Sequence, residues 1–555
     1  MQHFNILTRR GFFDRSFKLG LGVALSTLVD IPLVVKRALA EGTIGVPGAN
    51  GKTKKLLFIF LRGANDALNS VIPIQDSAYA SSRPTLKIPP DTLTNYSAVG
   101  PCDFPIGSAA TDLTFGYRNA IHLGNGFAAL HPSLKFLAPV YNAGDLALVH
   151  RVGYPKQSRS HFDSQNYWET GNPNNNLVKD GILYRAMVES GIANSAPLTG
   201  VSVQSSLPLV LRGSSAAMTN LTDPTRYNLL GIPNNPAGNS KADAAIQAAN
   251  GFPFADEKNR ELLNLQYKNL NDTLSIFAQL NFSEAGNTFR DDPATDNDTT
   301  WANAATGGYY LFPTTNAKNG GWDRGGGVTN AQKYVVDTAA YGFFNNLKAA
   351  ALILNKTDAI VAGTEMGGFD THSNQVSVND STAGAHANLQ SRIAWAIYAL
   401  RKYFLNYGDK TTWDNLVIVT LSEFGRTTVE NADRGTDHAE AGVMFIAGGA
   451  VKGYNKGNST GVFGCHTSDS VPWITGPANQ AFGVDGSMFG ASDRYLKRAY
   501  DYRSVLGKLI RDHLGATQNQ LNRIIPGYAV TGERLLNGGT STVDLVPIIG
   551  EPNIV

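Results

Sequence analysis

Short apolar runs most constrain what this 555-residue chain can fold into. The segments Leu56–Leu61, Leu416–Leu421 and Gly442–Ile446 lack the polar alternation of a half-exposed strand. Such runs are typical of strands buried on both faces, as in parallel sheets. Helical patterns follow at about 383–406 and 502–513. Because strands and helices alternate, the sequence predicts an α/β fold, a three-layer α/β/α sandwich on a largely parallel sheet.

Changes in composition indicate the domain boundaries. The main domain is expected over residues 54–530, with a C-terminal tail at 531–555. Within it, residues 233–330 are rich in Asn, Gly, Asp and Thr, and one amphipathic helical pattern lies at 256–280. This region is interpreted as an inserted, irregular and helical cap. A short apolar run at Leu209–Leu211 predicts one further strand.

The N-terminus has the pattern of an export signal. The pair Arg9 and Arg10 precedes an apolar stretch at 19–29, and a small-residue cleavage motif ends at Ala40. This predicts a twin-arginine signal peptide over residues 1–40, and therefore a periplasmic or secreted bacterial protein carried by the twin-arginine export machinery. The stretch is shorter than the roughly 20 residues of a membrane span, so no stable span is expected in the mature chain.

Charge and cysteine content narrow the partners. The formal net charge is +2, which gives no electrostatic argument for binding nucleic acid. The two cysteines, Cys102 and Cys465, could pair in an oxidising compartment, and the sequence leaves their pairing open. The lack of a Cys-x-x-Cys motif excludes a cysteine-rich zinc cluster.

Three short motifs combine carboxylates with histidine or arginine. Each lies beside an apolar run, where open α/β sheets place their sites. Oxygen and imidazole ligands gathered at strand ends favour a divalent-metal site, and an arginine there can bind a phosphate or sulfate oxygen. The structural alternatives are a turn-capping aspartate, a Glu–Arg pair and a loop histidine with a local hydrogen bond. In chain order the motifs hold Asp370 with His372, Glu423 with Arg426, and Asp437, as the expected orienting partner, with His438.

Another candidate segment follows a further apolar run. Ser158, Arg159 and Ser160 precede His161 and open a predicted helix that ends at Gly171. The serine hydroxyls offer nucleophiles, while Arg159 and the free N–H groups of the helix start offer an anion site. The structural alternative is a serine that only caps the helix.

Together these motifs resemble an exported bacterial family, the domain of unknown function 1501. The resemblance spans about residues 54–528 and also rests on the segments Arg62–Asn69, His131–Leu134 and Ser158–Gly171. That family is similar to the alkaline phosphatase and sulfatase superfamily. The resemblance therefore implies an alkaline phosphatase-like fold and a metal-dependent hydrolase of phosphate or sulfate esters.

The resemblance also implies roles for individual residues. Asp370 and His372 resemble one metal position of the superfamily, and His438 resembles its final metal-binding histidine. Asp66 lies a few residues beyond the position of the aspartate that follows the first strand. Glu423 stands where the superfamily keeps an Asp-His pair, which favours one metal over two. One divalent metal is expected, with calcium, manganese and zinc as the alternatives.

Two functions remain open at this point. The first is an exported hydrolase in which the metal polarises a small anionic ester, a serine or a water attacks, and an arginine steadies the charge. The second is a non-catalytic envelope binding protein, a pseudoenzyme with an anion or glycan pocket. The hydrolase hypothesis uses Ser160 or Ser158, Arg159 and Arg426, and the ligands Asp370, His372, Glu423, His438 and Asp66.

Overall fold

The computed structural model describes most of the predicted main domain. The signal peptide at 1–40, most of the insertion at 233–330, Cys102 and Cys465 lie outside the described residues. None of the helices described has the length and apolar character that crossing a membrane requires. The described residues are 43–48, 51–90, 118–124, 128–193, 198–223, 309–312, 336–457, 460–464, 494–496, 498–529, 532–545 and 547–555, and six more between 244 and 291.

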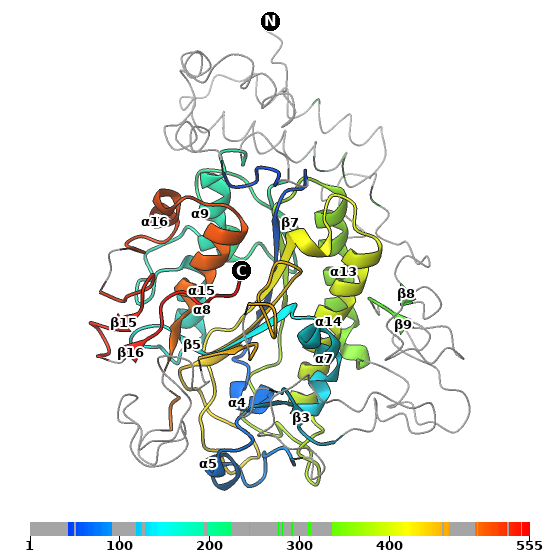
Figure 1. The fold of residues 1–555 in the computed structure, drawn as a ribbon, viewed down its shortest axis with the longest axis vertical. Coiled ribbons are helices and arrows are strands. Elements are labelled where there is room, and N and C mark those ends of the chain that lie inside the picture. Colours follow the sequence, from blue (N-terminus) through cyan, green and yellow to red (C-terminus); the bar gives the residue numbers. More distant parts are fainter. Residues whose placement is uncertain are drawn as a thin grey trace, which may run out of the picture.

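One large mixed sheet forms the centre of the molecule (Figure 1). In the described chain it has nine strands, in the order β13-β5-β12-β11-β1-β10-β6-β7, with β14 also paired to β5. Strand β1 lies in the middle, which fits the unbroken apolar run of its sequence. The bounds are β1 Lys55–Leu61, β5 Leu146–Gly153, β6 Gly200–Val203, β7 Thr219–Leu221, β10 Val361–Met366, β11 Leu416–Leu421, β12 Gly442–Ala447, β13 Val462–Phe463 and β14 Tyr500–Asp501.

The strand directions bring several loops to one edge of this sheet. Strand β1 pairs in parallel with β10 and β11, and β10 pairs in parallel with β6. Strand β12 runs antiparallel to both of its neighbours, β11 and β5. The start of β12 therefore lies at the same edge as the ends of β1, β5, β10 and β11. The predicted α/β fold on a largely parallel sheet is confirmed.

Helices pack on both faces of the sheet. Figure 1 shows α13 and α14 on one side and α8, α9, α15 and α16 on the other. Each side has its own apolar cluster. The predicted helices at 383–406 and 502–513 are confirmed, the second as α15 and a π-helical turn at Leu509–His513. The bounds are α8 His161–Thr170, α9 Ile182–Glu189, α13 Tyr341–Lys356, α14 Ala385–Asn406, α15 Tyr502–Lys508 and α16 Gln518–Ile524.

Strand β1 shows how the two apolar clusters are divided. All seven of its residues are buried. Leu57, Ile59 and Leu61 belong to the cluster beneath α13 and α14, whereas Leu56 and Phe58 belong to the cluster beneath α8 and α9. Successive side chains of a strand point to opposite faces, so the unbroken apolar run from Leu56 to Leu61 fills both clusters.

Shorter elements complete the described chain. The prediction of a strand at Leu209–Leu211 is wrong, because these residues form a 3-10 turn that begins after Pro208. Proline has no N–H to donate to a strand ladder. The remaining bounds are α4 Ala67–Ser70, β2 Val71–Ile72, α5 Ser77–Ser82, β3 Ile121–His122, β4 Ala129–Leu130, α7 Ala138–Asn142, β8 Arg290–Asp291, β9 Tyr309–Tyr310, β15 Gly539–Thr540 and β16 Pro547–Ile548, with 3-10 turns at Pro132–Leu137, Thr338–Ala340 and Trp413–Asn415.

The C-terminal residues pack onto the main domain. Leu535 and Ile554 are buried in the cluster beneath α8 and α9. The backbone N–H of Ile549 donates a hydrogen bond to the carbonyl of Ala499, beside β14.

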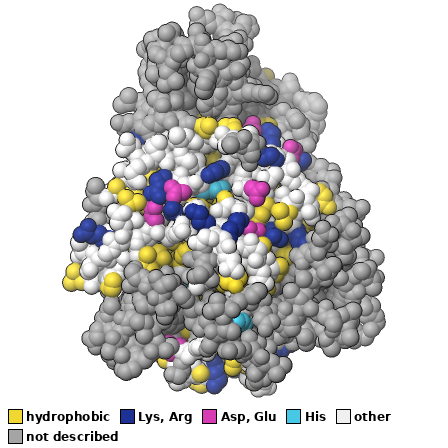
Figure 2. Space-filling model, viewed as in Figure 1, with side chains coloured by type: hydrophobic (Ala, Val, Ile, Leu, Met, Phe, Trp, Pro, Cys, Tyr) yellow, Lys and Arg dark blue, Asp and Glu magenta, His cyan; other side chains and the backbone are white. Residues whose placement is uncertain are grey.

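On the face shown in Figure 2, basic and acidic side chains lie next to one another, with small hydrophobic patches between them.

Candidate functional site

The residues singled out in the sequence meet at the edge where β1, β5, β10 and β11 end. Asp370 and His372 follow β10, and Glu423 follows β11. His438 precedes β12, whose antiparallel direction brings its start to this edge. His161, the first residue of α8, arrives from the loop after β5. The prediction that these motifs share one edge is confirmed by their contacts.

Helix α8 begins at the site because of local capping. The hydroxyl of Ser160 accepts a hydrogen bond from the backbone N–H of Asp163, and Gly171 ends the helix in the left-handed conformation, with φ 67°. The Ser158 hydroxyl accepts from the backbone N–H of Ser160. Ser160 is therefore the N-cap, and His161 enters the site from the first position of the helix.

Three imidazole nitrogens surround one carboxylate oxygen. The Oδ1 atom of Asp370 lies 3.4 Å from His161 Nε2, 3.1 Å from His372 Nε2 and 3.2 Å from His438 Nε2. His161, Asp370 and His438 form a group whose donor atoms lie within 4.8 Å of one another. The Asp370 side chain is 47% exposed, so solvent and ligands reach this point.

Two of these imidazoles have their other nitrogen fixed by an acceptor. His161 Nδ1 lies 2.8 Å from Glu423 Oε1, and His438 Nδ1 lies 2.8 Å from the backbone carbonyl of Arg159. A carboxylate and a carbonyl only accept hydrogen bonds, so both Nδ1 atoms carry the proton. In the neutral rings the Nε2 atoms then present lone pairs to Asp370.

His372 follows the same pattern with a different partner. Its Nδ1 lies 3.2 Å from Asp437 Oδ1, and Arg494 and Asn431 hold that carboxylate from the other side. Asp437 was expected to orient His438, but it orients His372, because the carbonyl of Arg159 already meets His438. Burial raises the pKa of Asp437, but the hydrogen bonds from Asn431 and His372 outweigh burial and hold the pKa below its ordinary value.

The lone pairs face one another at close range. His372 Nε2 and His438 Nε2 are 2.8 Å apart. Two lone pairs at this separation repel unless a proton or a cation lies between them. His161 Nε2 is buried and has no hydrogen-bond partner among the described residues. This arrangement fits metal ligands, whose second ring nitrogen almost always donates to a carboxylate or carbonyl.

Glu423 holds the His161 ring in place from the side opposite to Asp370 by contacting its Nδ1 atom. It is fully buried, and its Oε1 accepts hydrogen bonds from His161 Nδ1, from Gln165 Nε2 at 2.9 Å and from the backbone N–H of Gly63 at 2.8 Å. Burial raises its pKa, but these hydrogen bonds outweigh burial and hold the pKa below its ordinary value. In turn, the hydrogen bond to Glu423 raises the pKa of His161. Glu423 thus orients a donor and does not join the group.

Arg426 fixes Asp370 from beneath. Its fully buried guanidinium lies 2.6 Å from Asp370 Oδ1 and donates to the backbone carbonyls of Ala64, Gly63, Phe369 and Thr436. Burial raises the pKa of Asp370, but the hydrogen bond and charge of Arg426 outweigh it and lower the pKa to about 2. Arg426 is occupied by these contacts, whereas the exposed Arg159 packs over the Tyr495 ring, 4.2 Å from its centroid.

Asp66 lies in a separate buried ion pair. Its Oδ2 is 2.7 Å from Arg83, with both side chains fully buried, and it also accepts a hydrogen bond from Gln375. Burial raises the pKa of Asp66, and Arg83 lowers it by more. Of the five predicted ligands, the structure brings Asp370, His372 and His438 together, places Glu423 one contact away and leaves Asp66 outside the group.

His161 is the donor that the metal prediction missed. In the sequence it stands out only as part of the helix-opening segment. The available signal was its position: a histidine at the first residue of a helix that follows a strand ending at the same sheet edge. Gln165, Asn431 and Arg494 were missed as well. Each of them contacts a residue distant in sequence and has no motif of its own.

Comparisons with known proteins give one match. A family model described as "Protein of unknown function (DUF1501)" matches residues 53–470, which include every residue of the donor group. The comparisons with curated proteins and with solved structures found no match.

Proposed function

We propose that this chain, which belongs to the family described as "Protein of unknown function (DUF1501)", is a metal-dependent hydrolase of phosphate or sulfate esters. One observation carries the proposal. The Nε2 atoms of His161, His372 and His438 all approach Asp370 Oδ1, and the Nδ1–H group of each ring donates a hydrogen bond to a fixed acceptor. Carboxylate and carbonyl partners behind ligating histidines are a common feature of metal sites.

The donor chemistry favours a transition metal over calcium. Calcium takes six to eight oxygen ligands, whereas imidazole suits zinc and its neighbours. A tetrahedral zinc with bonds of about 2.0–2.1 Å separates its ligand atoms by about 3.3 Å. The separations of 3.4 Å from His161 and 3.2 Å from His438 to Asp370 are of that size. We therefore place zinc first and manganese second, with His161, Asp370 and His438 as ligands and His372 beside them.

The protonation states of His438 and Asp370 suit such a site, while a bound metal would have to displace the proton that Glu423 favours on His161. Burial lowers the pKa of His438, so its ring is neutral near pH 7, and Asp370 is ionised. Metal ligands must be deprotonated in this way. A bound divalent metal would act as a Lewis acid on an ester oxygen.

Arginines around the site favour an anionic ester. Arg159 is exposed, and its carbonyl touches His438, while the half-exposed Arg494 pairs with Asp437. These guanidinium groups would bind phosphate or sulfate oxygens. Ser160 remains the candidate nucleophile, and water is the alternative. Among the described residues, the Ser160 hydroxyl has one hydrogen bond, which it accepts from the backbone N–H of Asp163. The proposed export through residues 1–40 would place the reaction outside the cytoplasm.

A non-catalytic envelope protein is the second candidate. One three-residue donor group occurs in the described chain, whereas many phosphatases clamp the ester between two metals. A site with a single metal and no working nucleophile would bind an anionic ester without cleaving it.

Metal analysis with hydrolysis assays would test the proposal. We expect purified protein to hold about one zinc or manganese ion per chain and to cleave 4-nitrophenyl phosphate or sulfate. Replacing ligands, in Asp370→Asn and His438→Ala, should remove the metal and lower turnover by more than about 100-fold, beyond the loss typical of an outer-shell change. Asp433→Asn, an exposed carboxylate in the loop that carries His438, is the matched control.

The outcomes separate the two candidates. Metal-free protein, or full turnover in both ligand variants, contradicts the proposed centre. Metal bound at His438 without hydrolysis of any aryl ester favours the binding protein. With turnover established, loss of activity in Ser160→Ala assigns the serine as nucleophile, and retained activity assigns water.

A further inference from the structure

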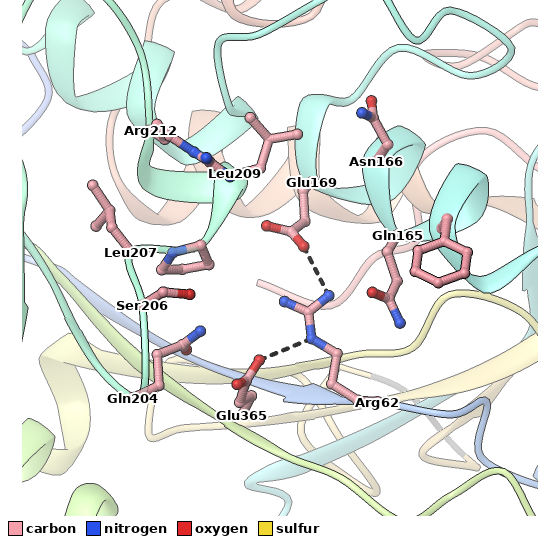
Figure 3. Close-up of a pocket in the computed structure, with 12 residues that line it drawn as sticks. Arg62, Gln165, Asn166, Glu169, Gln204, Ser206, Leu207, Leu209, Arg212 and Glu365 are labelled. Atoms are coloured by element: carbon pink, nitrogen blue, oxygen red, sulfur yellow. Dashed lines mark hydrogen bonds and ion pairs between the residues drawn. The ribbon is translucent and has the colours of Figure 1, made fainter. Parts of the chain in front are cut away.

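A pocket of 490 Å³ opens beside the histidine site. Its volume falls in the range of about 300–1,000 Å³ that is usual for small-ligand sites. Figure 3 shows the Arg62 guanidinium held between the carboxylates of Glu169 and Glu365, with Gln204 and Ser206 on one side and Gln165 on the other. None of the motifs identified in the sequence predicted this pocket.

Helix α8 connects the pocket to the histidine site. His161, Gln165 and Glu169 are spaced four residues apart and therefore lie along one face of the helix. His161 belongs to the donor group, Gln165 lines the pocket and donates to Glu423, and Glu169 lines the pocket and pairs with Arg62. A ligand in the pocket would thus lie one helical turn from the site.

The polar groups of the pocket are balanced in charge. Arg62 lies 2.7 Å from Glu169 and 3.0 Å from Glu365, and Arg212 is exposed at the lining. Two guanidinium groups and two carboxylates thus line the pocket, so it gives no net attraction for a second anion. The Glu365 side chain remains 30% exposed and can still accept hydrogen bonds. Adjacent fixed donors and acceptors match hydroxyl groups, which both donate and accept.

The remaining wall of the pocket is apolar. Phe162 lines it with a ring that is 89% exposed, and Leu207, Pro208 and Leu209 add aliphatic surface. A ligand that covers this ring would remove apolar surface from water, which favours binding. A saccharide ring presents a C–H face for such a wall and hydroxyl edges for the polar groups.

We infer that this pocket binds one neutral monosaccharide ring, as the part of the substrate that carries the ester. The inference that the pocket binds a saccharide ring depends on the pocket alone. The inference that this ring carries the ester of the substrate rests on the proposed hydrolase function. The substrate class is then a phosphorylated or sulfated saccharide, with the ester group at the histidine site and the ring along α8.

Ligand-observed NMR would test the binding step without any turnover. The probes are methyl glycosides of glucose, galactose and N-acetylglucosamine, with adenosine as a flat aromatic competitor and inorganic sulfate as an anion. We expect saturation transfer from the full-length protein to at least one glycoside. The signal should fall at least threefold in Phe162→Ala and in Arg212→Ala. Leu177→Ala, which removes a side chain 87% exposed outside the pocket lining, is the matched control and should keep the signal.

Several outcomes overturn the inference. These are no transfer to any glycoside, equal transfer in Phe162→Ala and wild type, or displacement of the glycoside by sulfate or adenosine at lower concentration. A second measurement separates this result from the hydrolase proposal. If glycosides bind but their phosphate and sulfate esters are not cleaved, the pocket stands and the hydrolase fails; if aryl esters are cleaved and glycosides do not bind, the reverse holds.

Discussion

At the scale of single residues, the site depends on which ring nitrogen each histidine turns toward a fixed acceptor. His161, His372 and His438 meet a carboxylate, a carboxylate and a carbonyl through Nδ1. These acceptors turn the three Nε2 atoms toward Asp370 Oδ1, the orientation that a ligating histidine needs. The residue types alone do not show this, because a histidine with a local hydrogen bond has the same sequence.

The first prediction concerns the acceptor behind His161. We expect Glu423→Gln to weaken zinc affinity by about 10- to 100-fold, as for other outer-shell changes, because the amide carries no charge to fix the ring. Competition with a chromophoric chelator measures the dissociation constant. Asp433→Asn should leave it unchanged. Equal affinities in Glu423→Gln and wild type would show that the charge of Glu423 does not support the metal site through His161.

At the scale of elements, two turns at the sheet edge pack backbone to backbone. Gly63, after β1, has φ +112°, and a Cβ placed there would lie 2.4 Å from the backbone nitrogen of Asp370. Gly63 also donates to Glu423 and accepts from Arg426. The turn after β1 therefore sets the position of the turn after β10, and a glycine is needed for both the conformation and the close approach.

The second prediction tests this packing. We expect Gly63→Ala to lower the free energy of unfolding by at least about 1–3 kcal/mol, the usual cost of a strained backbone conformation. Gly367→Ala, in the neighbouring turn, is the control, because a Cβ there meets nothing within 4 Å. It should change stability by less than about 0.5 kcal/mol. Urea denaturation of both variants measures the difference, and similar losses would argue against the close contact.

At the scale of the whole molecule, buried histidines link stability to pH. Burial lowers the pKa of His150 and of His513 to about 4, and it also lowers the pKa of His131 and His386. In the unfolded chain these rings titrate near about 6.5. Between the two values the unfolded chain binds protons that the native protein does not, so stability is present above about pH 6.5 and is lost as the pH falls toward 4.

The third prediction isolates one of these rings. His513 Nε2 lies 2.8 Å from the carbonyl of Lys55, at the start of β1, and a glutamine can keep this donor. We expect His513→Gln to reduce the slope of unfolding free energy against pH, between pH 6.5 and 4, by about 1.4 kcal/mol per pH unit. Denaturant titrations at several pH values measure the slope. A slope equal to that of wild type would mean that His513 is protonated in the native state.

Local sequence patterns predicted many of the elements of the fold. The apolar run of β1, the helical repeat of α14 and the caps of α8 at Ser160 and Gly171 are visible in the sequence, since each depends on neighbours within a few residues. The short run at Leu209–Leu211 was misassigned because three residues give too little periodicity to separate a strand from a turn.

The sequence by itself determined the class of fold, the sheet edge that carries the site, and three of the residues that meet there, Asp370, His372 and His438. Only the tertiary structure decided which residues contact one another at the site. Glu423 contacts His161 across 262 residues of chain, and the antiparallel direction of β12 brings His438 to the same point. Local sequence fixes residue type and strand period, but pairing between distant segments depends on the packing of the whole sheet, which no short motif records.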